Sequence, residues 1–162
     1  MKLEAKYQAL LSHAQQHQDV NVQGMSLCFQ LLSLSARIDR DCAALLAPYG
    51  LSEARFVLLF LLKEAPEGIP SHILAERAGV TRATVTTLVD GLLKAGWVQR
   101  FAAEADRRSV MVKLSPQGEE LAKTLVGTHA QWIGNLFRHL SEAECAQLSA
   151  LLNKAAAGEQ AS

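Results

Sequence analysis

Three observations on the sequence predict a mainly α-helical chain with one small β-hairpin, which is an α+β arrangement. Apolar residues recur every three or four positions along most of the 162 residues, which is the spacing of amphipathic helices. Two short alternating runs, at 97–101 and 109–114, interrupt this pattern. The hydrophobic content of 49% is enough for an ordinary core without disulfides or metals. We therefore expect helices packed around a core, with two paired strands.

Three helices are predicted in the N-terminal part of the chain. Residues 1–19 carry apolar residues at helical spacing and are followed by the polar sequence DVNVQG. A longer helix is expected over about 24–47, where the sequence APYG ends it. Ser52 is the expected N-cap of the third helix. This helix is apolar nearly all round until EAPEG, so it should be buried on most of its surface.

Shorter elements are expected next. A brief extended piece at 69–70 precedes a helix with Ser71 as its N-cap and Gly79 at its end. The next helix should begin at the N-cap Thr81 and end at Gly96. The two strands, joined by the loop AAEADRR, come after it.

Two more helices are predicted in the C-terminal part of the chain. Ser115 is the expected N-cap and Pro116 the first residue of a helix that runs to about 139. The sequence SEAE at 141–144 fits a capping box, in which a serine and a glutamate satisfy each other's backbone N–H groups. It should begin the last helix.

The charge of the chain is unevenly distributed, although it sums to zero. Residues 1–75 have a balance of minus one and residues 116–162 a balance of minus two, while residues 76–115 have a balance of plus three. A basic middle between acidic flanks is the modest electrostatic footprint expected for a partner that is a polyanion.

A helix, a tight turn, a second helix and a β-hairpin follow one another over 71–114, and this order is a winged helix-turn-helix. Burial of the apolar residues of the second helix would turn a small polar face to solvent near its N-terminus. That face suits a major groove, which admits an α-helix. The candidate DNA-binding residues of the two helices are Ser71, Thr81, Arg82, Thr84, Thr86 and Thr87.

The hairpin loop carries two adjacent arginines, Arg107 and Arg108, at the expected tip of the wing. Both are candidate DNA-binding residues, because arginine is attracted by the negative potential of a narrow minor groove. Asp106 can hold one guanidinium in a bidentate fork and so orient the wing.

The run LAERAGVTRATVTTLVDGLLKAGWVQRFAAEADRRSVMVKLSPQGEEL, residues 74–121, resembles the winged-helix core of the MarR family of bacterial transcription regulators. The sequence DRR occupies the Asp-x-Arg wing signature of that family, and VKLSPQGEEL the strand and helix start that follow it. The resemblance extends more weakly over about 24–155. Residues 1–19 lie outside the common core.

The resemblance implies a homodimer that binds double-stranded DNA at a pseudo-palindromic operator, with recognition helices in major grooves and wings in minor grooves. It also implies repression that ends when a small aromatic or phenolic compound binds between the dimerisation helices and the DNA-binding lobe. Arg108 matches the wing arginine of the family and Asp106 the residue that orients it. Thr87 stands where the family often has an arginine, which leaves Arg82, Arg100 or Arg77 as candidate partners of Asp106.

Three parts are expected along the chain: dimerisation helices over 1–50, the DNA-binding lobe over 51–115, and further dimerisation helices over 116–158. A pocket for an aromatic effector would draw on aromatic side chains from different parts of the chain. Its candidate residues are Phe29, Tyr49, Phe56 and Trp132.

Two alternatives stay open. One is an oxidant-sensing regulator that uses Cys28 or Cys42, and the other is a winged-helix protein-interaction module that does not bind DNA. An enzyme is not expected, because no nucleophile, base and orienting group can be assembled, and no cofactor or metal site is indicated.

The compartment follows from three further observations. No stretch reaches the roughly 18 apolar residues of a membrane span, and the N-terminus lacks the apolar core of a signal peptide. Three widely spaced cysteines suit a reducing compartment. We therefore expect a cytoplasmic protein without a membrane partner.

Overall fold

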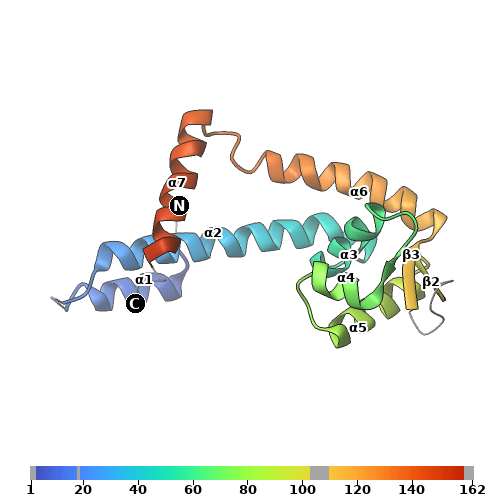
Figure 1. Cartoon of the computed structure of the whole chain (residues 1–162). Coiled ribbons are helices and arrows are strands. Elements are labelled where there is room, and N and C mark those ends of the chain that lie inside the picture. Colours follow the sequence, from blue (N-terminus) through green and yellow to red (C-terminus); the bar gives the residue numbers. More distant parts are fainter. Residues whose placement is uncertain (1–2, 18, 103–109, 159–162) are drawn as a thin grey trace.

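The computed structural model describes residues 3–17, 19–102 and 110–158. Helices α2 and α6 extend away from a lobe that holds α3, α4, α5 and the strands, and α7 returns to cross α2 (Figure 1). The mainly helical α+β prediction is confirmed. The elements are α1 (Ala5–Ala14), α2 (Val22–Leu46), a 3-10 turn (Ala47–Tyr49), α3 (Glu53–Lys63), β1 (Ile69–Pro70), α4 (Ser71–Arg77), α5 (Arg82–Lys94), β2 (Val98–Ala102), β3 (Val110–Leu114), α6 (Pro116–Gly134) and α7 (Glu142–Gly158).

The sheet contains the expected hairpin and one more strand. Its order is β1-β3-β2, and both pairings are antiparallel. Ile69 in β1 lies opposite Val112 in β3, and both side chains are buried. Pro70, which has no N–H to donate, is tolerated because β1 is an edge strand. The brief extended piece therefore closes the lobe by pairing with the wing.

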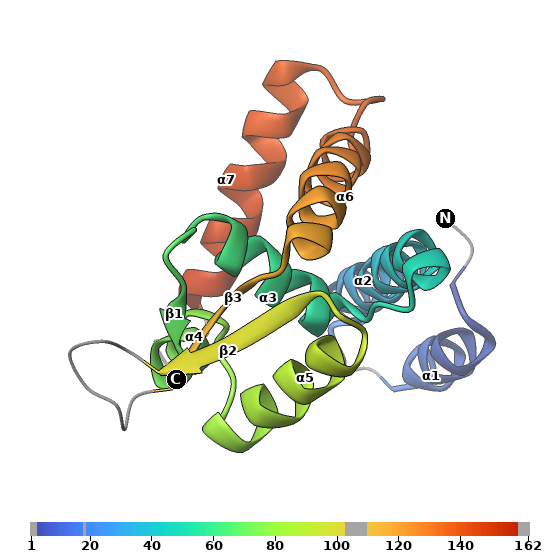
Figure 2. The same ribbon diagram turned by 90° about the vertical axis from the view of Figure 1, so that its right-hand side faces the viewer.

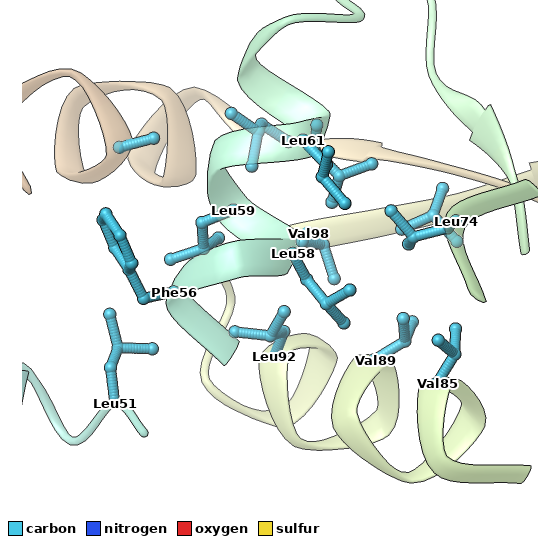
Figure 3. Close-up of a cluster of buried hydrophobic side chains, with 14 of the residues drawn as sticks. Leu51, Phe56, Leu58, Leu59, Leu61, Leu74, Val85, Val89, Leu92 and Val98 are labelled. Carbon is cyan, nitrogen blue, oxygen red and sulfur yellow. The ribbon is translucent and has the colours of Figure 1, made fainter. Parts of the chain in front are cut away.

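The core of the lobe is built on α3, as its all-round apolar pattern predicts. Its buried side chains include Leu58 and Leu59, which are fully enclosed. Figure 3 shows α3 above α5, with Val85, Val89 and Leu92 of α5 pointing toward it. The apolar cluster reaches Leu46 of α2 and Leu125 of α6, so the inner ends of both long helices are anchored to the lobe.

Four of the predicted helix starts are confirmed by side-chain hydrogen bonds. The hydroxyl oxygens of Ser52, Thr81 and Ser115 accept from the backbone N–H three residues later, at 3.4, 3.2 and 3.0 Å. At the start of α7, Glu144 Oε2 accepts from the Ser141 N–H at 2.8 Å, which completes the capping box. Such caps join residues close in sequence, and this is why the sequence alone reveals them.

Ser71 is not the N-cap of α4, contrary to the sequence prediction. The N-cap is Pro70, and Ser71 is the first helical residue. The Ser71 hydroxyl instead donates to the Val110 carbonyl of β3 at 3.3 Å. Pairing of β1 with β3 sets the chain direction at 70, so tertiary structure overrides the local capping signal.

Helix α6 ends earlier than predicted, at Gly134 rather than near residue 139. Glycine is about 1 kcal/mol less favourable than alanine in a helix, and Asn135 follows it. The chain then makes short turns, with the Leu140 N–H donating to the Phe137 carbonyl at 2.9 Å. These turns allow α7 to run back across α2 (Figure 1).

No single helix within 3–17, 19–102 and 110–158 is both long and apolar enough to cross a membrane. The segments Val22–Tyr49 and Glu53–Lys63 satisfy the length and composition criteria only when taken together, and they meet at a bend of 70°.

Candidate nucleic-acid interface

Helix α5 is the second helix of the helix-turn-helix, and its apolar residues fix its orientation. Val85, Val89 and Leu92 are at most 1% exposed and face the core (Figure 3). Because the helix has 3.6 residues per turn, the opposite face is directed away from the lobe. Five residues on its first two turns are exposed: Arg82, Ala83, Thr84, Thr86 and Thr87.

The threonine hydroxyls on this face are bonded within the helix-turn-helix itself. Thr86 Oγ1 donates to the Arg82 carbonyl at 3.0 Å, and Thr87 Oγ1 donates to the Ala83 carbonyl at 3.2 Å. Thr81 Oγ1 and Thr84 Oγ1 lie 2.9 Å apart and share a hydrogen bond. The exposed surface is therefore small and ordered, which suits close approach to a duplex.

An ion pair and a close approach tie the middle of α5 to neighbouring elements. Arg100 Nη2 of β2 lies 2.8 Å from Asp90 Oδ1. The Arg55 guanidinium of α3 rests on Gly91, where an added Cβ would lie 2.5 Å from Nη2. Neither contact could be predicted from the sequence, because Asp90 and Gly91 meet partners on other elements and the helical pattern carries no signal for them.

The wing is described up to the ends of its strands. Asp106, Arg107 and Arg108, which the sequence predicts at its tip, lie outside the described residues. Arg100, one of the candidate partners of Asp106, pairs with Asp90 among the described residues. Figure 2 shows the hairpin beside α5, so helix and wing lie at the same end of the lobe.

The four aromatic residues predicted to line an effector pocket occupy three places. Phe29 stacks on Tyr7 of α1, with ring centroids 4.6 Å apart. Tyr49 is exposed at the end of the 3-10 turn. Only Phe56 and Trp132 come together, and they do so through His129, whose ring centroid lies 4.4 and 5.3 Å from theirs. The effector pocket stays a prediction.

His129 of α6 contacts both α2 and α3 at the root of the lobe, the place where these three helices meet. Its Nε2 lies 3.7 Å from Cys42 Sγ of α2, and its ring lies against Phe56 of α3. Burial lowers the pKa of His129, and the nearby Glu53 carboxylate opposes this shift only in part. Burial likewise raises the pKa of the Cys42 thiol, so Cys42 remains largely protonated at neutral pH. Phe56, Trp132 and Cys42 were singled out in the sequence but His129 was not, because its partner Cys42 lies 87 positions away.

The lowered pKa of His129 makes the stability of the fold dependent on pH. The unfolded chain takes up a proton near the ordinary value of 6.5, while the folded chain resists protonation until lower pH. Stability contributed by neutral His129 is therefore complete above about pH 7 and is lost as the pH falls through 6.5 toward the lower folded pKa.

Thermal melts of the wild type and of His129→Gln between about pH 7.5 and 5.5, above the range where carboxylates titrate, measure this effect. The wild type should lose stability toward acid more steeply than the variant. His139→Gln, at an exposed position beyond α6, is the matched control and should follow the wild type. If the stability of the wild type and of His129→Gln falls equally with pH, the lowered pKa of His129 is contradicted.

Residues 51–110 match the model of the MarR family. The chain is 29% identical over 140 residues to the HTH-type transcriptional repressor YetL of Bacillus subtilis, a match that covers 86% of this chain and 84% of the relative. It is 31% identical over 138 residues to the HTH-type transcriptional regulator PecS of Dickeya dadantii, with 84% and 83% covered. Both matches extend well beyond the helix-turn-helix.

Solved structures agree with the fold. Wild-type MarR from Escherichia coli in its apo form has a TM-score of 0.64 and 27% identity, with 78% of this chain and 93% of that chain covered. MepR from Staphylococcus aureus in a complex with DNA has a TM-score of 0.69 and 20% identity, with 80% and 95% covered. The resemblance inferred from the wing motif is confirmed: the chain belongs to the MarR family of winged helix-turn-helix transcription regulators.

Proposed function

We propose that the chain is a sequence-specific DNA-binding repressor that acts in the cytoplasm. The observation that carries this proposal is the exposed N-terminal face of α5, which is small, polar and fixed by the buried opposite face. A recognition helix must combine such a face with firm anchoring in order to enter a major groove. The basic balance of residues 76–115 supports a polyanionic partner.

Relatives support the same conclusion. YetL is named a transcriptional repressor, and so is MprA of Escherichia coli, to which the chain is 25% identical over 148 residues. MepR, which has the same fold, has been solved with DNA. None of these relatives is named as an enzyme, and proteins of this family regulate transcription.

The proposed unit is a homodimer on a pseudo-palindromic operator. We assign dimerisation to residues 1–50 and 116–158, and DNA binding to residues 51–115. Apolar residues of α2 and α7 line an open groove of about 440 Å³, which a second copy of the chain would cover. The two copies of α5 would then reach half-sites about 10 base pairs apart.

Salt dependence separates DNA binding from the rival function, a winged-helix module that binds proteins only. Each phosphate contact releases counterions, so affinity for a duplex should fall steeply with salt, with a logarithmic slope of about −0.9 per contact. Fluorescence anisotropy with a labelled duplex taken from upstream of the gene measures it. An affinity that is absent or insensitive to salt would favour the protein-interaction module.

Arg108→Ala is expected to weaken operator binding by about 1–3 kcal/mol, because Arg108 matches the wing arginine of the family. The loss should be accompanied by a smaller salt slope. Arg138→Ala removes the same charge from an exposed position beyond α6 and serves as the control. Gel-shift titrations of the three proteins on one duplex measure the difference. If Arg108→Ala and Arg138→Ala bind equally well, the proposed wing contact is wrong.

We further propose that a small aromatic compound releases the protein from DNA. The cluster of Phe56, His129 and Trp132 supports a site at the root of the lobe, because it joins α3 to α6 and contacts α2 through Cys42. A ligand inserted there would change the angle between the lobe and the long helices. Loss of the gel-shifted band in the presence of a panel of phenolic compounds tests this proposal, and a band that resists all of them contradicts it.

Oxidant sensing is the second candidate response, and the two cysteines differ in their suitability for it. Cys42 is 4% exposed and its pKa is raised by burial, which disfavours the reactive thiolate. Cys28 is exposed on α2. Operator binding that is unchanged by peroxide would remove this candidate, and its loss in the wild type but not in Cys28→Ser would support it.

A further inference from the structure

The hydrogen bonds of Thr86 and Thr87 determine what their side chains can offer a base pair. Each hydroxyl has one proton, and in both residues it is donated to the carbonyl four residues earlier in α5. What remains exposed is a pair of acceptor lone pairs and a γ-methyl group. The bond also restricts χ1, so the position of the methyl group is fixed with it.

We propose that Thr86 and Thr87 make the protein specific for A·T pairs at the centre of each half-site, an inference that rests on the proposed DNA-binding function. In the major groove an A·T pair presents both the adenine N6 amino donor and the thymine C5-methyl group. The donor matches the threonine lone pairs and the methyl matches the γ-methyl. A C·G pair offers an amino donor but no methyl group, so it satisfies only half of each side chain.

The rest of the exposed face limits the alternatives. Guanine is read by arginine or lysine and adenine commonly by asparagine or glutamine. Among the described residues of α5, Arg82 is the sole side chain of these kinds on the exposed N-terminal turns. Asp90, one turn after Thr86, is engaged by Arg100. Arg82 is therefore assigned to a single guanine that flanks the A·T pairs.

The first test is selection from a pool of random duplexes with the wild-type protein. The expected half-site has adjacent A·T pairs at its centre and one flanking G·C pair. A recovered half-site whose centre is made of G·C pairs would overturn the inference while leaving DNA binding intact. If the pool yields no enriched sequence, the proposed function itself fails.

The second test uses the recovered duplex with base analogues, each of which removes one functional group from the major groove. Deoxyuridine in place of thymidine removes the C5-methyl group, and 2-aminopurine in place of adenine removes the N6 amino group from the major groove. At a contacted pair we expect binding about fourfold weaker for the lost methyl contact and about fivefold weaker for the lost hydrogen bond. If neither change weakens binding at any central pair, the inference is overturned.

Two variants assign the contacts to a side chain. Thr86→Val keeps the methyl group and removes the acceptor, so it should lose sensitivity to 2-aminopurine and keep sensitivity to deoxyuridine. Thr86→Ser should show the reverse pattern, and the same pair of variants applies at Thr87. Both positions are exposed, so neither variant is expected to unfold α5.

Thr124 of α6 provides the matched control. It is exposed and its hydroxyl donates to the Glu120 carbonyl at 3.1 Å, just as Thr86 bonds within α5. Thr124→Val and Thr124→Ser should leave both sensitivities unchanged. If the Thr86 and Thr87 variants also leave both sensitivities unchanged, the assignment of these side chains is wrong.

Discussion

Replacing Gly118 by alanine is expected to lower the free energy of unfolding by about 3 kcal/mol or more. A Cβ on Gly118 would overlap the Trp97 carbonyl oxygen, which belongs to the turn between α5 and β2. That oxygen also accepts from the Ser115 N–H at 3.0 Å. Relief of the clash would separate the two segments and break this hydrogen bond. Overpacking typically costs about 1–3 kcal/mol and a lost buried hydrogen bond about 1–3 kcal/mol more.

Gly127→Ala is the control, because Gly127 lies in the same helix α6. No described heavy atom lies within 4 Å of a Cβ built on Gly127, apart from the helix backbone and chain neighbours. Alanine is the better helix former, so this variant should be as stable as the wild type or more stable by up to about 1 kcal/mol. Urea denaturation compares the three proteins. Equal midpoints for Gly118→Ala and Gly127→Ala would contradict the close approach to Trp97.

The contrast between these glycines shows what the sequence reveals and what it hides. The start of α6 was predictable, because Ser115 caps the N–H of Gly118 three residues later. The need for glycine at 118 was not, because the obstructing carbonyl comes from Trp97 in another segment. Local hydrogen bonds leave a sequence signal, whereas close approaches between segments depend on how the elements pack.

The same distinction separates the correct predictions for the lobe from the wrong ones. Thr81 and the glycine at 96 were correctly assigned to the two ends of α5, and the positive φ of Gly96, 79°, lets the chain turn into β2. Serine is a residue type favoured at N-caps, yet the pairing of β1 with β3 brings the Ser71 hydroxyl to the Val110 carbonyl instead. Edge pairing of a two-residue strand has too little pattern to be recognised from sequence.

The exposed face of α5 could be predicted from the sequence, whereas the contacts that hold α5 in place could not. The exposed residues of α5 follow from its helical period and its buried leucine and valine residues. The partner of Arg100 could not be predicted in the same way, and from the sequence Arg100 is one of three candidate partners of Asp106. In the structure it pairs with Asp90 across the junction of α5 and β2. An exposed pair of this kind contributes at most about 1 kcal/mol, but it joins α5 directly to the first strand of the wing.

Helix α7 bears on the proposed dimer, because the rest of its own chain barely covers it. Among residues 142–157 only Leu148 is partly buried, and Leu151 is 57% exposed. Leu31 of α2, on the other side of the same groove, is 48% exposed. A helix of this length is marginal in water unless an apolar face is packed. In the proposed dimer a second copy of the chain would supply this packing and cover the exposed leucines.

Leu151→Glu is therefore expected to dissociate the proposed dimer, weakening self-association by more than about 100-fold, or about 3 kcal/mol. In the proposed dimer the second copy would bury this position, and the substitution would place an unpaired carboxylate there in place of an apolar side chain. In a two-fold symmetric dimer the change occurs twice, which increases the loss. Sedimentation velocity measures the oligomeric state, and a gel-shift measures operator binding. The monomer retains an intact α5 but presents it to one half-site only, so specific binding should fall with dimerisation.

Asn153→Glu introduces the same charge two residues later, on the opposite side of α7 according to the helical period. It should remain dimeric and bind the operator like the wild type. The comparison separates burial of the Leu151 side chain from a general effect of negative charge near DNA. A Leu151→Glu protein that sediments as the wild type does would remove the α2 and α7 groove from the interface. Dimerisation would then have to rest on other surfaces, and the assignment of 116–158 to dimerisation would be wrong.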